Sequence, residues 1–191
     1  MTPPEASNRP HVSVIVPVCN EAGMLVQALA SLRQQLEAWG LDHEVLVCEN
    51  GSTDSTLMLT RTIAGQWPRL TVLSLPAPNY GLALRMGLGR ARGNIAALLN
   101  VDFLDFRFLQ QALALIERDG VDVVVGSKRL PASVDERTAI RRYLTRAFNT
   151  LLGWLFGTRL TDTHGLKVMR LERIRPVIQA CVLGGEIFDT E

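Results

Sequence analysis

Two aspartates follow an apolar run at residues 95–99, in a position typical of a metal site. The run is long enough for a strand buried on both faces of a sheet, and carboxylates appear only where it stops. In an open α/β sheet, ligands bind at this end of the strands, where a carboxylate can hold a hard cation that also binds phosphate oxygens. Asp102 and Asp105 are therefore candidate ligands for Mg²⁺ or Mn²⁺. The open alternative is that Asp102 caps a helix predicted over 106–118, because aspartate is a preferred N-cap residue.

Polar side chains also follow two other predicted strands, so that three strand ends carry them, at 18–21, 48–54 and 100–102. A nucleotide needs such a set, with an acceptor for base N–H groups, a partner for the ribose hydroxyls and a cation for the diphosphate. Taken singly, Asn20, Ser52 and Asp54 are equally well explained as helix caps. Their coincidence at one predicted edge of the sheet favours a nucleotide site.

Other chemistries lack their usual patterns in this sequence. There is no phosphate-binding loop of the Walker type, and residues 81–93 lack the glycine spacing of a dinucleotide fingerprint. His11, His43 and His164 are scattered without metal-ligand spacing, and no serine, histidine and acid pattern indicates a hydrolase. The formal net charge of +1 argues against a nucleic-acid partner bound through bulk positive charge.

The elements that must position these groups alternate along the first two thirds of the chain. Strands are predicted over 12–18, 44–48, 70–75, 95–100 and 121–126. Helices are predicted over 21–39, from a cap at Ser52 or Thr53 to about 65, over 80–92 and over 106–118. This alternation predicts an α/β fold with a mainly parallel sheet flanked by helices. Beyond residue 126 it gives way to a helix at 137–156, a short strand at 165–169 and a helix at 171–181.

Length and composition predict one domain in a reduced, cytoplasmic setting. The chain has 191 residues, 47% of them hydrophobic, and residues 1–11 form a polar, flexible leader without a signal peptide. Its three cysteines, Cys19, Cys48 and Cys181, lack metal-site spacing. The apolar stretch 147–158 is too short for a bilayer core of about 30 Å. Residues 184–191 stop without a helix terminator, as expected of a domain truncated at its C-terminal end.

Basic residues concentrate in the predicted helix 137–156 and just before it. From Lys128 to Arg146 there are six basic residues against two acidic ones, an excess that suits an anionic ligand or membrane surface. Aromatic residues share the helix with arginines, an arrangement that would suit peripheral contact with an anionic membrane. The alternative is a helix that packs its apolar face on the sheet and leaves a solvated basic edge.

Taken together, these segments resemble the successive motifs of family 2 glycosyltransferases, which have the GT-A fold. The likeness rests on residues 12–21, 47–56, 79–87 with 91–93, 100–105, 126–129, 142–146 with Asn149, 161–165 and 188–191. It is greatest to the branch of dolichyl-phosphate mannose synthases and bacterial polyprenyl-phosphate glycosyltransferases. The resemblance covers residues 12–191 and implies a single glycosyltransferase domain.

The resemblance also implies roles for individual residues. The donor-binding set would be Pro17, Asn20, Glu21, Glu49, Asn50, Ser52, Asp54, Gly81, Arg85 and Asn100, with Glu49 as the partner of the base. Asp102 would be the metal ligand of an Asp-X-Asp motif, and Lys128, Arg129 and Arg142 would bind phosphates. A lipid-phosphate acceptor is already an anionic nucleophile, whereas a carbohydrate hydroxyl needs a base, for which Asp189 and Glu191 are candidates.

One departure bears directly on the metal. Asn100 stands at the first position of the Asp-X-Asp motif, so the site has one carboxylate fewer unless Asp105 compensates. The expected function is transfer of a hexose from a UDP- or GDP-linked donor to an acceptor, with polyprenyl phosphate preferred. The alternatives are a non-catalytic nucleotide-binding descendant and a sugar-nucleotide nucleotidyltransferase. The latter normally has a glycine-rich, basic N-terminal loop, which residues 18–24 do not form.

Overall fold

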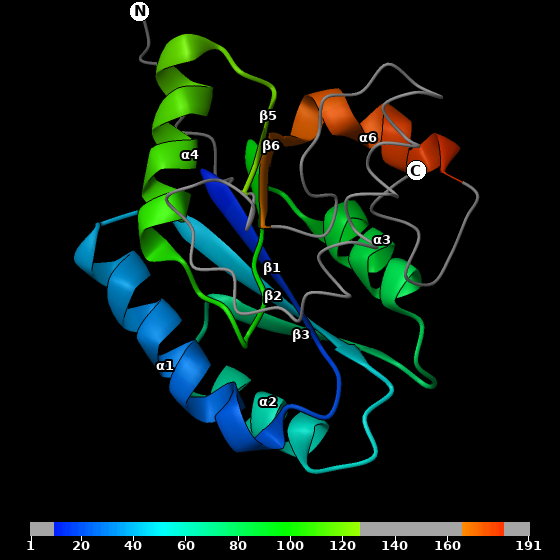
Figure 1. Ribbon diagram of the computed structural model, residues 1–191. Helices are drawn as coiled ribbons and strands as arrows, with labels where there is room; N and C mark the ends of the chain where they lie inside the picture. Colours follow the sequence, from blue (N-terminus) through cyan, green and yellow to red (C-terminus); the bar gives the residue numbers. More distant parts are fainter. Residues whose placement is uncertain (1–9, 127–165, 182–191) are drawn as a thin grey trace, which may run out of the picture.

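The structure is a computed structural model that describes residues 10–126 and 166–181 (Figure 1). Its strands are β1 (Val12–Val18), β2 (His43–Asn50), β3 (Leu70–Leu75), β4 (Ile95–Leu98), β5 (Val123–Val125) and β6 (Lys167–Arg170). Its helices are α1 (Ala22–Ala38), α2 (Thr56–Ala64), α3 (Tyr80–Arg90), α4 (Phe106–Asp119) and α6 (Leu171–Ala180). The predictions for Lys128, Arg129, Arg142, His164, Asp189, Glu191 and the helix 137–156 lie outside the described residues.

The six strands form one sheet in the order β3-β2-β1-β4-β6-β5. Neighbours among β1 to β4 run parallel, whereas β6 lies antiparallel to both β4 and β5. The mainly parallel sheet predicted from the alternation is confirmed. The strand order reverses between β1 and β4, because β2 and β3 lie on one side of β1 and β4 lies on the other. A ligand crevice is expected at the carboxyl ends of two such strands.

Helices cover both faces of this sheet. Helices α1, α2 and α4 lie on one side and α3 and α6 on the other (Figure 1). Alternate valines of β1 belong to the hydrophobic core that β1 shares with α1 and α4. Ile15 belongs to a second hydrophobic core, which includes residues of α3 and α6. A strand with apolar residues toward two helical layers is typical of a parallel sheet buried on both faces.

The ends of several elements differ from the prediction. Helix α2 starts at Thr56, and neither predicted residue caps it, because the hydroxyls of Ser52 and Thr53 bond to Asn20. Strand β4 ends at Leu98, two residues early, because the chain turns at 100–103. Helix α3 ends at Arg90 rather than Arg92.

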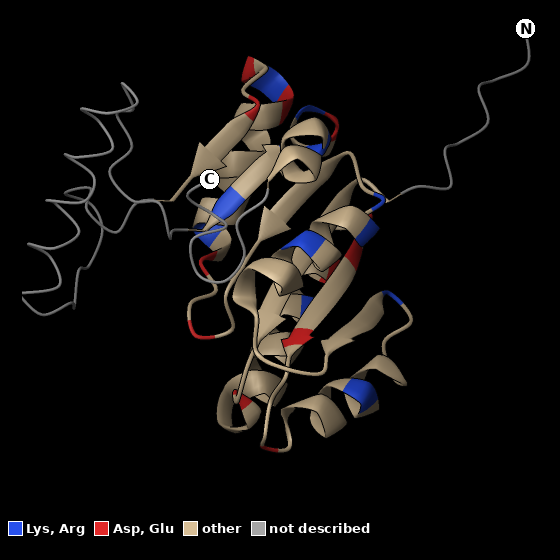
Figure 2. Ribbon diagram, turned by 90° about the vertical axis from the view of Figure 1, so that its right-hand side faces the viewer, with Lys and Arg blue, Asp and Glu red and all other residues tan. Residues whose placement is uncertain are grey.

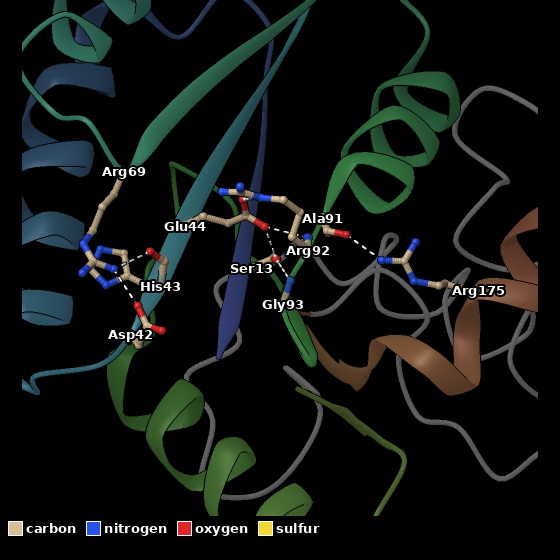
Figure 3. A network of polar contacts seen from close by, with 9 residues as sticks. All are labelled: Ser13, Asp42, His43, Glu44, Arg69, Ala91, Arg92, Gly93 and Arg175. Carbon is tan, nitrogen blue, oxygen red and sulfur yellow. Dashed lines mark hydrogen bonds and ion pairs between the residues drawn. The ribbon is translucent and has the colours of Figure 1, made fainter. Parts of the chain in front are cut away.

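A polar network joins the amino ends of β1 and β2 to the segment that follows α3 (Figure 3). The buried Glu44 carboxylate accepts hydrogen bonds from the Ser13 hydroxyl at 2.7 Å, from the Arg92 backbone N–H at 2.7 Å and from Arg92 Nε at 2.9 Å. The Ser13 hydroxyl in turn accepts the Gly93 N–H at 2.8 Å. Because each of these groups is paired, burial of the carboxylate is offset by the bonds it accepts.

We expect Glu44→Ala to lower the free energy of unfolding by about 2–3 kcal/mol, because it leaves a buried hydroxyl and a backbone N–H without an acceptor. The Arg92 side chain is 66% exposed, so water screens its charge and the ion pair itself adds little. Urea unfolding measures the loss. The control is Glu37→Ala, which removes an exposed ion pair with Arg33 and should cost about 0.5 kcal/mol or less. If both variants lost the same free energy of unfolding, the buried network would not contribute more to stability than the exposed ion pair.

Candidate functional site

Three loops meet at the carboxyl edge of the sheet, at the lower end of the ribbon in Figure 1. They are the β1–α1 loop at 19–21, the β2–α2 loop at 51–55 and the β4–α4 loop at 99–105. The strand order places β1 between β2 and β4, so the first loop lies between the other two. The strand ends predicted to converge are therefore on neighbouring strands.

Asn20 links the first loop to the second. Its side-chain oxygen accepts hydrogen bonds from the Thr53 N–H at 2.8 Å and the Thr53 hydroxyl at 3.2 Å. Its own backbone N–H donates to the Ser52 hydroxyl at 3.0 Å. Asn20 has φ 56°, and among the described residues no other non-glycine residue has a positive φ. Asparagine adopts this left-handed conformation more readily than most residues, which explains the residue type at this bend.

Asp54 is bonded to the starts of two helices. One carboxylate oxygen accepts the Thr56 N–H at 2.9 Å and the other accepts the Ala22 N–H at 3.2 Å. Hydrogen bonds from Thr56, and then from Ala22, hold the pKa of this exposed carboxyl below its usual value. The Thr56 hydroxyl completes the link by accepting the Glu21 N–H at 2.8 Å. Asp54 thus bonds to the first residues of α1 and α2, as the capping interpretation expected, whereas Asn20 and Ser52 join the two loops and cap neither helix.

Glu49 and Asn50 connect the second loop to β3 and α3. The Glu49 side chain is buried, and its two oxygens accept hydrogen bonds from the Ser52 N–H and the Ser74 hydroxyl, each at 2.5 Å. The Asn50 side-chain oxygen accepts the Asn79 N–H at 2.5 Å. Both oxygens of Glu49 are bonded within the protein, so its contact with a base stays a prediction.

The β4–α4 loop separates the roles of the two aspartates. The Phe103 N–H donates to the Asn100 carbonyl at 3.2 Å, which closes a turn with Val101 buried and Asp102 exposed. Asp105, and not Asp102, is the N-cap of α4, because its carboxylate accepts the Phe108 N–H at 2.8 Å. The helix-cap alternative weighed for Asp102 is therefore wrong. The Asp102 carboxylate lies at the surface of the turn.

Carboxylates concentrate around this edge. Burial raises the pKa of the Glu21 carboxyl, and the nearby charges of Asp102 and Asp54 raise it further. Burial also raises the pKa of the Cys19 thiol, with further contributions from Glu49, Asp54 and Glu21. Figure 2 shows acidic positions in the loops at this end of the sheet. Negative charges that repel one another attract a cation, so oxygen donors of this kind suit Mg²⁺ or Mn²⁺.

The donor set for such a cation is small. Within residues 10–126 and 166–181, no three side chains of histidine, cysteine, aspartate or glutamate are grouped as metal ligands. Mg²⁺ sites commonly use one or two carboxylates and complete the coordination with water and substrate phosphates. Asp102 fits that role.

We expect Glu21→Gln to raise the Tm at pH 7 when divalent cations are chelated. The pKa of Glu21 is higher in the folded state than in the unfolded state. Its ionisation therefore destabilises the fold as the pH rises from the unfolded-state pKa through the folded-state pKa. Glutamine removes that penalty, and the gain should vanish below the usual pKa of glutamate. Thermal unfolding at several pH values measures it. Glu37→Gln, which removes an exposed carboxylate paired with Arg33, is the control and should not raise the Tm. A gain that persists in acid would contradict the electrostatic origin.

The remaining predicted residues lie around this edge. Pro17 pairs with Cys48 across β1 and β2, Gly81 is buried in the first turn of α3, and Arg85 is half-buried one turn later. Sequence reasoning missed Thr56 as a link between loops. Its signal is the Asp54-X-Thr56 spacing, in which an aspartate bonds the backbone two residues on.

A sheet whose strand order reverses beside a cluster of polar loops is typical of α/β proteins that bind a ligand at this edge. Comparison with known sequences then gives the family. The profile described as Glycosyl transferase family 2 matches residues 13–174, and the chain belongs to that family. Its fold is the GT-A fold.

Individual relatives agree with this family. The chain is 32% identical over 123 residues to "Glycosyltransferase AglE" of Haloferax volcanii, covering 63% of this chain and 40% of the relative. It is 27% identical over 174 residues to "Dodecaprenyl-phosphate galacturonate synthase" of Rhizobium johnstonii, covering 87% and 49%. The solved mannosyltransferase PcManGT of Pyrobaculum calidifontis, in complex with GDP-Man and Mn²⁺, superposes with a TM-score of 0.61 at 24% identity, covering 90% of this chain and 47% of that one. The chain spans about half the length of these relatives or less.

Proposed function

We propose that the protein transfers a hexose from a UDP- or GDP-linked donor to a polyprenyl phosphate. The observation that carries the proposal is Asp102, an exposed carboxylate on a tight turn near Glu21, at the point where the strand order of a family 2 chain reverses. The Rhizobium relative is named for a lipid phosphate of this kind, dodecaprenyl phosphate. The Pyrobaculum structure holds a nucleotide sugar and Mn²⁺. These relatives support the proposed donor, metal and acceptor classes.

In the proposed reaction, an acceptor phosphate oxygen attacks the anomeric carbon of the sugar. The bond from that carbon to the donor's diphosphate breaks, and the nucleoside diphosphate leaves with the electron pair. The acceptor oxygen is already anionic, so no general base is needed. A divalent cation would supply positive charge for the leaving diphosphate. Asp102 would hold it, and the nearby loops would fix the donor.

A polyprenyl phosphate acceptor would bring the protein to a membrane surface, and we propose that this is the cytoplasmic face. Among the helices of residues 10–126 and 166–181, none has the length and apolar character needed to cross a bilayer. We assign membrane contact to residues 137–156 and phosphate binding to Lys128, Arg129 and Arg142 from the sequence. A carbohydrate acceptor would need a base, for which Asp189 and Glu191 remain the candidates.

The test combines binding with transfer. Calorimetric titration of UDP-glucose and GDP-mannose, with Mn²⁺ or with a chelator, should show metal-dependent binding of one donor. Incubation of that donor with a short polyprenyl phosphate should give the lipid-linked sugar, detected by chromatography. If the protein bound the donor but neither transferred nor hydrolysed its sugar, a non-catalytic descendant would be favoured. Formation of a nucleotide sugar from a sugar phosphate and a nucleoside triphosphate would favour a nucleotidyltransferase.

A further inference from the structure

We propose that Asn20 is a positioning residue whose side-chain oxygen acts on the donor site through the β2–α2 loop. The inference rests on the proposed function and deepens it. It assigns Asn20 the task of keeping two donor-binding loops at a fixed separation. The side-chain oxygen of Asn20 already accepts hydrogen bonds from the protein, so this atom serves the loop and not a ligand.

The contacts of Asn20 point to its neighbouring loop. Its side-chain oxygen receives the N–H and hydroxyl of Thr53 at 2.8 and 3.2 Å and the N–H of Asp54 at 3.4 Å. A carbonyl oxygen has two lone pairs, so three donors leave no acceptor capacity for a nucleotide. The backbone N–H of Asn20 is occupied as well, by the Ser52 hydroxyl at 3.0 Å.

The left-handed backbone makes both sets of contacts available from one residue. At φ 56° the chain bends sharply after β1, and the backbone N–H and the side-chain oxygen both reach the β2–α2 loop. The backbone N–H groups of the next two residues, Glu21 and Ala22, donate to the Thr56 hydroxyl at the start of α2 and to the Asp54 carboxylate of that loop. The bend therefore begins a continuous series of links between the two loops.

These links fix charges as well as backbone. Burial raises the pKa of Glu21, and the charges of Asp102 and Asp54 raise it further, so each of these two carboxylates is close enough to interact with Glu21. Asp54 and Glu21 lie in the loops that Asn20 joins, while Asp102 lies in a separate turn. Loss of the link would let the β2–α2 loop move relative to Asp102. We expect weaker donor binding as a result, because a site held in its binding geometry loses less entropy when the ligand binds.

Three variants separate the acceptor from the backbone conformation. Asn20→Gly accepts a positive φ but removes the side-chain oxygen, whereas Asn20→Asp keeps an acceptor and tolerates the same φ. Gly40→Ala is the matched control, because Gly40 has φ 61° in open space, so alanine there introduces left-handed strain away from the site. Amide hydrogen exchange at Thr53 and Asp54 reports the link directly. Titration of UDP and GDP in the presence of Mn²⁺ reports the site.

We expect Asn20→Gly to speed exchange at these two amides about tenfold and to weaken binding of the nucleotide that the wild type prefers by about tenfold. Asn20→Asp should retain the amide protection, and Gly40→Ala should leave both readouts unchanged. Unchanged exchange in Asn20→Gly would overturn the inference, whether or not either nucleotide binds. Faster exchange with unchanged affinity would also overturn it. If the wild type bound neither nucleotide, the proposed function would fail, and the positioning role in donor binding would fail with it.

Discussion

Asp102→Asn is expected to lower the rate of sugar transfer about 100- to 1,000-fold, the range found when one electrostatic stabiliser of a transition state is removed. The exchange keeps the size of the side chain and removes its negative charge. Since Asn100 is already neutral, the variant leaves no carboxylate at either acidic position of the Asp-X-Asp motif. The loss should appear both as slower transfer and as a higher Mn²⁺ concentration needed for half-maximal rate.

The matched control for this prediction is Asp105→Asn. Asparagine caps a helix about as well as aspartate, so α4 should keep its start and the protein its stability. Transfer should stay close to the wild-type rate. If Asp105→Asn raised the Mn²⁺ requirement as much as Asp102→Asn, Asp105 would be a metal ligand as well as the N-cap of α4.

Gly51→Ala is expected to lower the free energy of unfolding by about 2–4 kcal/mol, the sum of left-handed strain and overpacking. Gly51 has φ 63°, and a Cβ there would lie 2.5 Å from the Ala77 carbonyl carbon and 2.6 Å from the Pro78 nitrogen. Both are backbone atoms, so the loop must move to relieve the clash. Because the same loop carries Ser52 and Asp54, nucleotide affinity should fall together with stability.

Gly40→Ala separates the two causes. Gly40 has φ 61°, but no atom lies within 4 Å of the position that a Cβ would take, so only the strain remains, at about 1 kcal/mol. Urea unfolding of both variants measures the difference, and titration of UDP or GDP measures the effect on the site. Similar losses of stability in the two variants would show that the loop moves at little cost in free energy. The close approach to Ala77 would then contribute nothing to the effect of Gly51→Ala.

Local patterns predicted most of the fold. Alternation of apolar strands and amphipathic helices was sufficient for β1 to β4 and α1 to α4, because each of these elements follows its neighbour in the chain. The place of β6 between β4 and β5 was not predictable in this way. It depends on pairing between Lys167–Arg170 and segments far earlier in the sequence, and no local propensity encodes that choice.

The site was predictable in its composition and less so in its detail. Residue types at the strand ends predicted the convergence of Asn20, Asp54 and Asp102. They did not reveal which aspartate caps α4, because Asp102 and Asp105 are equally good capping residues and only the turn at 100–103 decides between them. The left-handed conformation of Asn20 was also not evident, since it arises from bonds to a loop more than thirty residues later.

The antiparallel insertion of β6 has a consequence during synthesis. Ile95 of β4 pairs with Arg170, so this side of β4 has no β6 partner until the last described part of the chain has left the ribosome. The apolar run 95–99 would meanwhile present an open strand edge, the kind of surface that pairs with other chains. Valine-rich β5 also pairs with β6, so it has no partner from β6 during the same interval. We therefore expect the nascent protein to be prone to aggregation in the interval between completion of the first four strands and arrival of the sixth.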